Sequence, residues 1–292
     1  RRIPRMADVV PNHRLIDDPL HAADDVLQHC RPCEFPHRAS KRAVDKGPVE
    51  SFLRLACIVH REGSVGTRWS TIGDCTVVLE SWSLYQIETR IRAALVAPLP
   101  GDDAHRLLAP RPRRGWAPGY IPAGSKSAAA LILLYPLYDT PHFLLIVRAG
   151  KLAQHAGQVA LPGGMLEPNE TVRDAALREA TEEVGIDAAQ VDVLGTLTPL
   201  YIPVSGFALH PVIGLTETAP ALRAAATEVD RIMQVPLNDL LNPVNLRCGT
   251  RWRGDQQCQV PYFALQEERV WGATAMVLTE LLGVLGAPPS VP

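Results

Sequence analysis

The chain has 292 residues and a formal net charge of −2, with 47% hydrophobic and 21% charged residues. This composition is typical of a globular protein with an ample hydrophobic core. The positive and negative charges nearly balance, so the chain lacks the excess of positive charge that is typical of proteins that bind nucleic acid. Six scattered cysteines do not form a disulfide framework, and we find neither a signal peptide nor an apolar run of about 18 residues. We therefore expect a cytoplasmic protein that binds neither nucleic acid nor a membrane.

The first 83 residues differ in pattern from the remainder. Residues 13–46 sustain neither a helical nor a strand period, which predicts poorly ordered structure. Short apolar runs over 52–60 and 75–80 predict strands or one hairpin whose partner is not visible. We predict an N-terminal extension over 1–83 and a single domain over 84–288.

Regular patterns follow from residue 84 onward. Apolar residues at helical spacing predict an amphipathic helix over 84–96, which prolines then end. Near-continuous apolar runs predict buried strands. These strands span 128–135, 142–147, 191–197, 209–215, 232–235 and 260–263. A closing helix is expected within 270–285.

The clearest local signals surround a helix expected over 172–184. Thr171 followed three residues later by Asp174 resembles a capping box, and Gly185 is placed as a helix stop. The apolar residues of this segment share one face, which should pack against a sheet. We therefore expect one face of the helix to pack in the hydrophobic core and the opposite face to be available for binding or catalysis.

Three carboxylates occupy that opposite face. Glu179, Glu182 and Glu183 are spaced i, i+3 and i+4, so they project within about a quarter-turn of one another. Like charges this close destabilise a helix, and a hard divalent cation such as Mg²⁺ or Mn²⁺ would compensate them. The turn before the helix contains Gly163, whose carbonyl could reach the same ion. A solvated acidic surface is the alternative for any such run taken alone.

A fixed spacing joins the helix to this turn. Five residues separate Gly164 from Glu170, and seven more lead to the run 178–186 that contains the carboxylates. This spacing resembles the Nudix box, with its defining positions filled. The resemblance implies an α/β (α+β) Nudix fold, a mixed β-sheet sandwiched between α-helices. It also implies hydrolysis of a nucleoside diphosphate linked to another moiety.

The same resemblance implies roles for the box residues. Glu179, Glu182 and Glu183 would bind the metal, and Glu182 or Glu183 would take part in catalysis. Glu170 and Arg178 would hold the Gly164 loop onto the helix without touching substrate. Farther along, Glu228 precedes the strand over 232–235, where many Nudix enzymes place another metal ligand or the base. A solvated loop glutamate is the alternative for Glu228.

A second resemblance lies immediately upstream. Residues 144–149, Gly157 and 161–164 are similar to the extended signature of coenzyme A pyrophosphatases within the Nudix superfamily. The chain departs from this signature with Ile146 in place of Thr, Ala153 in place of Arg and Leu161 in place of Phe. Of these three departures the missing arginine matters most, because a guanidinium can bind phosphate bidentately and the methyl group of alanine cannot.

Several cations could contact the phosphates of such a substrate. Arg148, Lys151 and His155 precede the glycine turn and would neutralise charge on the leaving phosphate. A strand-end cap for Arg148 and a structural role for His155 are the alternatives. The arginines of 111–114 could also grip an anionic nucleotide, or could be solvated surface residues.

The function that these resemblances predict is metal-dependent cleavage of coenzyme A, or a derivative, to 3′,5′-ADP and 4′-phosphopantetheine. The alternatives are a Nudix hydrolase of NADH or ADP-ribose and a non-catalytic Nudix-fold nucleotide sensor. The sensor would have no need of a complete set of box carboxylates. The small-molecule nucleotide is the expected partner, and the sequence leaves the oligomeric state open, a homodimer included.

Overall fold

The computed structural model describes residues 82–150 and 157–289. The predicted extension therefore lies outside the described residues except for its last two positions, and so do the apolar runs over 52–60 and 75–80. The domain boundary at residue 84 remains a prediction. Within the described chain, α1 begins at that residue and spans Leu84–Leu95.

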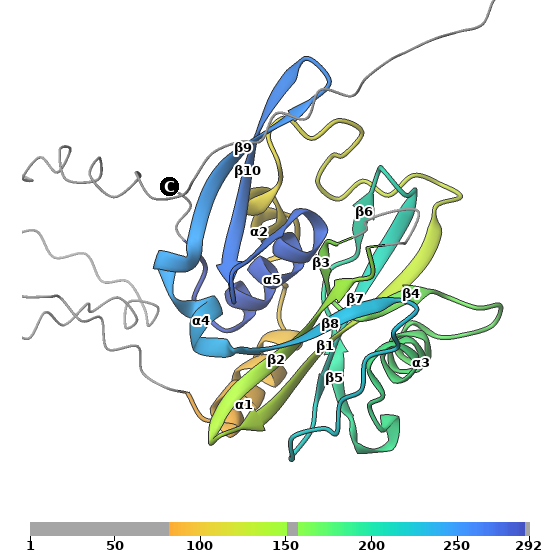
Figure 1. The fold of residues 1–292 in the computed structure, drawn as a ribbon, viewed down its shortest axis with the longest axis vertical. Helices are drawn as coiled ribbons and strands as arrows, with labels where there is room; N and C mark the ends of the chain where they lie inside the picture. The colour runs from red at the N-terminus through yellow and green to blue at the C-terminus, as the bar shows by residue number, and fades with distance from the viewer. Residues whose placement is uncertain (1–81, 151–156, 290–292) are drawn as a thin grey trace, which may run out of the picture. The chain divides into compact units, whose positions relative to one another are not determined.

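The secondary structure forms two sheets and five α-helices within the described residues (Figure 1). The other helices are α2 (Gly101–Leu108), α3 (Val172–Val184), α4 (Leu237–Leu241) and α5 (Gly272–Val284). The larger sheet contains β1 (Lys126–Leu137), β2 (Thr140–Arg148), β3 (Val159–Ala160), β4 (Gly163–Met165), β5 (Asp192–Thr196), β6 (Leu200–Ile202), β7 (Phe207–Leu215) and β8 (Val229–Pro236). The smaller sheet contains β9 (Leu246–Arg253), β10 (Gln256–Leu265) and β11 (Glu268–Trp271).

The larger sheet is mixed. Its main path runs β3-β2-β1-β7-β5, while β4 pairs with β1, β6 with β7 and β8 with β2. Strand β1 is parallel to β7, with Lys126 opposite Phe207, and the other pairings are antiparallel. The smaller sheet has the order β11-β10-β9.

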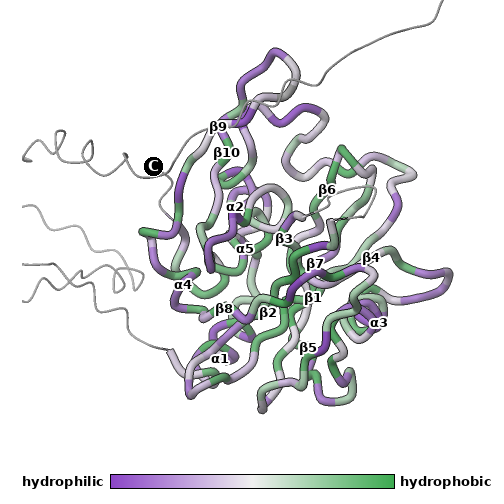
Figure 2. The backbone as a smooth tube through the Cα atoms, viewed as in Figure 1, coloured by the Kyte–Doolittle hydropathy of each residue, from purple (hydrophilic) through white to green (hydrophobic). Residues whose placement is uncertain are grey.

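Both faces of the larger sheet are buried, which explains the continuous apolar run of β1. Ile132 and Leu134 join a core cluster with residues of α1, α2 and α5, whereas Leu131 and Leu133 join a second cluster with α3. Successive side chains of a strand point to opposite faces, so a strand covered on both sides needs apolar residues at every position. Figure 2 shows the hydrophobic centre of β1 and β2 and the hydrophilic residues of α3.

The helix that carries the box carboxylates agrees with its sequence signals. Helix α3 begins after Thr171, whose hydroxyl accepts a hydrogen bond from the Asp174 backbone at 3.2 Å. It ends at Gly185, whose φ of 74° is the left-handed conformation that glycine adopts without strain. Its buried face presents Ala176, Ala180 and other small residues to the sheet. The predicted bounds, 172–184, are confirmed.

The fold class, a mixed sheet between helices, is confirmed, and the strand predictions match β1, β2, β5, β7, β8 and β10 within a few residues. The closing helix starts later than 270, because Val270 and Trp271 pair with β10 as part of β11. Helices α2 and α4 and strands β3, β4, β6, β9 and β11 were not predicted. Each is eight residues long or shorter, which leaves few residues over which a hydrophobic period can be recognised, and β9 has the largely polar sequence LRCGTRWR.

A buried polar cluster joins α2, α5 and the segment before β6. The fully buried carboxylate of Glu280 accepts hydrogen bonds from the Gly101 backbone at 3.2 Å and from the Thr198 hydroxyl at 2.7 Å. The Thr198 backbone also donates to it, at 3.1 Å, and His105 Nε2 lies 2.9 Å from its second oxygen. Several partners therefore offset the cost of burying this carboxylate.

Candidate active site

The glycine turn before α3 has a steric explanation. In strand β4, Gly164 pairs with Ala129 of β1. A Cβ added at Gly164 would overlap the carboxylate of Glu179, and one added at Gly163 would overlap the backbone of Ala129 and Ala130. The two glycines therefore let the turn lie between β1 and the acidic face of α3.

Arg178 connects the turn to the helix. Its Nε and Nη2 donate to the two carboxylate oxygens of Glu170 at 2.8 and 3.0 Å. Nη2 also donates to the carbonyl of Met165 at 3.1 Å. Nη1 donates to Glu179 at 2.9 Å and to Glu182 at 3.3 Å. The predicted Glu170–Arg178 pair is thus in bidentate contact, and the guanidinium also lies between the carboxylates of the acidic face.

Glu183 is the buried member of this acidic face, with 2% of its side chain exposed. Its Oε2 accepts a hydrogen bond from the Gly163 backbone at 2.9 Å, and its Oε1 lies 3.7 Å from Arg148 Nη1. Burial raises the pKa of the Glu183 carboxyl to about 7, and the negative charges of Glu179 and Glu228 act in the same direction. A single close hydrogen bond and a distant arginine thus hold this carboxyl among the described residues.

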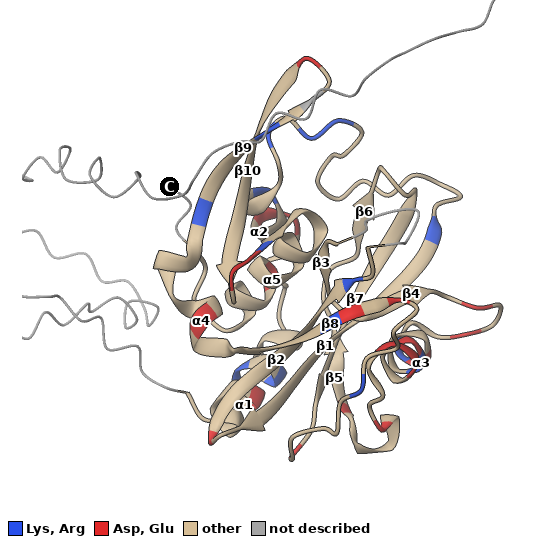
Figure 3. Ribbon diagram, in the orientation of Figure 1, with Lys and Arg blue, Asp and Glu red and all other residues tan. Residues whose placement is uncertain are grey.

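The other carboxylates differ in their surroundings. Burial raises the pKa of Glu179 although Arg178 opposes the shift, and the charges of Glu182 and Glu228 add to it. Glu182 is the most exposed, with 60% of its side chain accessible. The hydrogen bond from Arg178 lowers the pKa of Glu170. Carboxylates therefore gather on one face of α3, and Figure 3 shows red acidic residues together with blue basic ones on this helix.

Glu228 lies close enough to this face for its charge to act on two of the box carboxylates. Its backbone carbonyl accepts a hydrogen bond from the Ala149 backbone at 2.8 Å, directly after β2 delivers Arg148. Its charge raises the pKa of both Glu179 and Glu183. The structure thus brings Glu228 and Arg148 to the same edge of the site as the box carboxylates. Lys151 and His155 lie outside the described residues.

The ion pairs of Arg178 with Glu179 and Glu182 had not been predicted, and neither had two backbone contacts of the site. The backbone N–H of Gly163 donates to Glu183, whereas the sequence had suggested only a metal-directed role for its carbonyl. The carbonyl of Met165 accepts from Arg178. Both are backbone contacts, so side-chain identity gives no signal for them, although the adjacent glycines mark a close backbone approach.

The carboxylate oxygens of this face are the donors that Mg²⁺ and Mn²⁺ prefer. Among the described residues no group of three or more His, Cys, Asp or Glu side chains is arranged to hold an ion by itself. Arg178 lies between Glu170, Glu179 and Glu182. The residues fit an ion whose shell is shared with substrate phosphates, which is the usual arrangement for Mg²⁺.

Comparison with known proteins agrees with this geometry. The model of the NUDIX domain matches residues 127–247. A Photorhabdus laumondii protein named uncharacterized Nudix hydrolase NudL is 36% identical over 154 residues, which is 52% of this chain and 82% of that protein. A Klebsiella pneumoniae protein of the same name is 34% identical over 190 residues, 63% of this chain and 92% of that protein. The chain belongs to the Nudix hydrolase family.

A solved structure of a Nudix hydrolase from M. smegmatis, RenU, is 21% identical and covers 57% of this chain and 90% of that chain, with a TM-score of 0.41. The present chain is a Nudix pyrophosphohydrolase. Its acidic helix, its glycine turn and the arginine that bridges them are in direct contact. No helix in the part of the chain that the structure describes is long and apolar enough to cross a membrane.

Proposed function

We propose that this Nudix hydrolase cleaves the pyrophosphate bond of coenzyme A or its derivatives, giving 3′,5′-ADP and 4′-phosphopantetheine, with Mg²⁺ or Mn²⁺. The observation that carries the chemistry is the gathering of Glu179, Glu182 and Glu183 on the face of α3 that lies against the glycine turn. A divalent ion bound there supplies positive charge to the pyrophosphate oxygens and lowers the pKa of water.

The chain's own residues have separable tasks in this proposal. Glu179, Glu182 and Glu183 hold the ion, with the carbonyl of Gly163 as a further ligand. Arg178, which is bonded to Glu170 and to the carbonyl of Met165, keeps the glycine turn against α3. Arg148 reaches the same site from the end of β2 and offers a cation to a phosphate oxygen.

Proton transfer from the attacking water needs a carboxylate at the same place. Glu182, Glu183 and Glu228 are the candidates, since each lies in or beside the acidic face. Glu182 is the most exposed of the box carboxylates, so it is within reach of solvent and substrate. Single substitutions at the three positions, read as kcat at saturating metal, identify the residue that accepts the proton.

The coenzyme A assignment is supported by the signature formed by residues 144–149, Gly157 and 161–164. Coenzyme A carries a 3′-phosphate that NADH and ADP-ribose lack. The presence of Ala153, where the signature has an arginine, favours NADH or ADP-ribose as the second candidate. The substrate therefore has to be decided by turnover.

The test is a comparison of kcat/KM for coenzyme A, dephospho-coenzyme A, NADH and ADP-ribose, first with Mg²⁺ and then with Mn²⁺. We expect coenzyme A to be the preferred substrate and chelation of the metal to abolish turnover. Glu182→Gln should lower kcat by about 100-fold or more with the fold intact, because it replaces a charged ligand by a neutral one.

Glu167→Gln is the matched control, because this residue lies outside the defining positions of the box. Equal damage from both substitutions would contradict the roles assigned to the box. A clear preference for NADH or ADP-ribose would reject the coenzyme A assignment while leaving the Nudix chemistry intact.

A further inference from the structure

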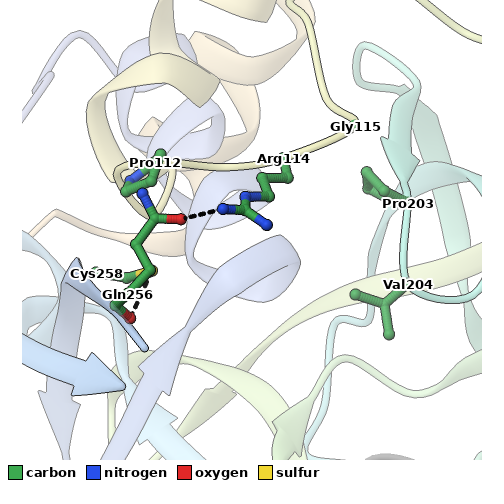
Figure 4. A pocket seen from close by; sticks show the side chains of 7 residues that line it. All are labelled: Pro112, Arg114, Gly115, Pro203, Val204, Gln256 and Cys258. Carbon is green, nitrogen blue, oxygen red and sulfur yellow. Dashed lines mark hydrogen bonds between the residues drawn. The ribbon is translucent and has the colours of Figure 1, made fainter. Parts of the chain in front are cut away.

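A cavity lies apart from the acidic face, between three segments of the chain. It has a volume of about 420 Å³ and is bordered by the loop before β1, the turn between β6 and β7, and the start of β10. Figure 4 shows Arg114 extending from the loop, with Pro203 and Val204 across the opening and Gln256 and Cys258 on β10. The cavity therefore combines one guanidinium with apolar and amide groups.

The charge of Arg114 has no acidic partner among the described residues. Its Nη2 donates to the side-chain oxygen of Gln256 at 2.7 Å, and no described carboxylate forms an ion pair with it. Gln256 is a neutral amide, so it orients the guanidinium without neutralising it. The neighbouring Arg113 is directed elsewhere, since its guanidinium lies 5.4 Å from the ring centre of Trp116 and 2.6 Å from the sulfur of Met276.

The loop that carries Arg114 is anchored on both sides of it. Arg111 exchanges two backbone hydrogen bonds of 2.8 Å with Gln259 of β10. Gly115 has a φ of 72°, and a Cβ added there would lie only 3.3 Å from the Cβ of Pro203. These contacts hold the position of Arg114 before any ligand binds, which lowers the entropic cost of binding.

The cavity borders the same end of β1 as the box turn. The turn that carries Val204 returns to β1 through a hydrogen bond from the Lys126 backbone to the carbonyl of Gly206, at 3.3 Å. The segment that follows Gly164 meets the next residue of β1, because the Leu166 backbone donates to Ser127 at 3.1 Å. The turn that forms one wall of the cavity and the segment that follows the box turn thus meet neighbouring residues at one end of β1. A ligand that extends past this strand end from the acidic face to Arg114 would meet opposite charges.

We propose that this cavity is an anion subsite, in which Arg114 binds a phosphomonoester of the substrate that is remote from the pyrophosphate cleaved at the acidic face. The proposal rests on the proposed function, because the 3′-phosphate of coenzyme A is such a group. A guanidinium with unused N–H donors is suited to phosphate. Gln256 fixes the orientation of that guanidinium, and Pro203 and Val204 offer apolar surface to the remainder of the nucleotide.

The first test compares kcat/KM for coenzyme A and dephospho-coenzyme A with Mg²⁺ in the full chain and in Arg114→Ala. We expect the substitution to lower kcat/KM for coenzyme A about tenfold, mainly through KM, and to leave dephospho-coenzyme A within about twofold of its original value. Arg114→Lys should recover part of the loss, because it keeps the charge but not the planar fork.

Arg106→Ala is the matched control. It removes an arginine from the neighbouring helix α2, where Arg106 is exposed and pairs with Asp103 at 3.4 Å. It should leave the ratio of the two substrates unchanged. Equal loss for both substrates in Arg114→Ala, or the same change in Arg106→Ala, would overturn the subsite.

The second test measures binding without turnover, by calorimetry with 3′,5′-ADP, 5′-AMP and inorganic phosphate. We expect 3′,5′-ADP to bind more tightly than 5′-AMP and the difference to disappear in Arg114→Ala. Equal affinities for the two nucleotides, or phosphate alone binding as tightly as 3′,5′-ADP, would overturn the proposal.

The two tests separate failure of the subsite from failure of the proposed function. Absence of coenzyme A turnover together with Arg114-dependent binding of 3′,5′-ADP would reject the substrate and keep the subsite. Turnover of coenzyme A that is indifferent to Arg114 would reject the subsite and keep the substrate.

Discussion

Two glutamates of the described chain are almost completely buried, and their surroundings differ. Glu280 accepts hydrogen bonds from Gly101 and from the backbone and hydroxyl of Thr198, and it lies 2.9 Å from His105 Nε2. From the described residues Glu183 accepts one hydrogen bond, from Gly163, and the nearest cation among them is 3.7 Å away. Both carboxylates have been removed from water, which costs several kcal/mol for an ion without compensation.

The difference indicates what each carboxylate does. The oxygens of Glu280 are occupied by groups of the protein itself, so this residue joins α5 to α2 and to the segment before β6. The Glu183 carboxyl can accept more hydrogen bonds than the described part of the chain donates to it, and its pKa is raised to about 7 by burial. A buried carboxyl that the fold leaves incompletely satisfied is suited to an external cation, whereas a saturated one serves stability.

The largest expected effect is the loss of activity in Glu183→Gln. The amide keeps the size of the side chain and can still accept from Gly163, so the free energy of unfolding should stay within about 1 kcal/mol of the original value. Activity should fall by about 100-fold to 1000-fold, because a charged ligand or base is lost. Urea unfolding and kcat measured on the same preparation check both parts.

Glu167→Gln serves again as the control for a lost surface charge. A Glu183→Gln protein that unfolds readily but keeps its kcat would reverse the comparison and make Glu183 a structural residue.

The next effect is a loss of stability in Glu280→Ala. The substitution leaves the hydrogen-bond donors of Gly101 and Thr198 without an acceptor and removes the buried partner of His105. The free energy of unfolding should therefore fall by about 3 kcal/mol or more. Glu280→Gln should cost less, since its carbonyl oxygen still accepts from part of the cluster. Thermal unfolding of the two variants measures the difference.

The activity of the folded fraction completes this test. With Glu280→Gln held well below its unfolding temperature, kcat/KM should remain within about threefold of the original value. An unchanged unfolding temperature together with a large loss of kcat would place Glu280 in the catalytic machinery instead.

The smallest expected effect is that of deleting residues 1–80. Helix α1 would keep Ser83, whose hydroxyl accepts a hydrogen bond from the Gln86 backbone and whose own backbone N–H donates to the side-chain oxygen of Gln86. We expect kcat/KM within about twofold of the full chain. A deletion reaching residue 96 is the contrasting control, because it also removes the buried Ile87 and Ile91, each worth a few kcal/mol in a core. Loss of both folding and turnover in the shorter deletion would show that the boundary at residue 84 is wrong.

The local parts of the site could be predicted from the sequence. Thr171 and Gly185 bound α3, and the spacing of Glu179, Glu182 and Glu183 places them on one face, because both signals act within one or two helical turns. The pairing of Glu170 with Arg178 was predicted from the family resemblance, and its geometry agrees. The backbone donor at Gly163 could not be predicted, since it depends on how β4 lies against β1.

By itself, the sequence determined the short-range features: the bounds of the box helix, its acidic face and the apolar strands that support it. Only the tertiary structure decided which of the two buried glutamates has several hydrogen-bond partners within the protein. His105 and Glu280 are 175 residues apart, and no local sequence pattern marks either residue as a partner of the other. The same holds for Arg114, whose contact with Gln256 spans 142 residues. Contacts of this kind depend on the packing of whole elements, whereas helix periodicity and capping are set by residues that are neighbours in the chain.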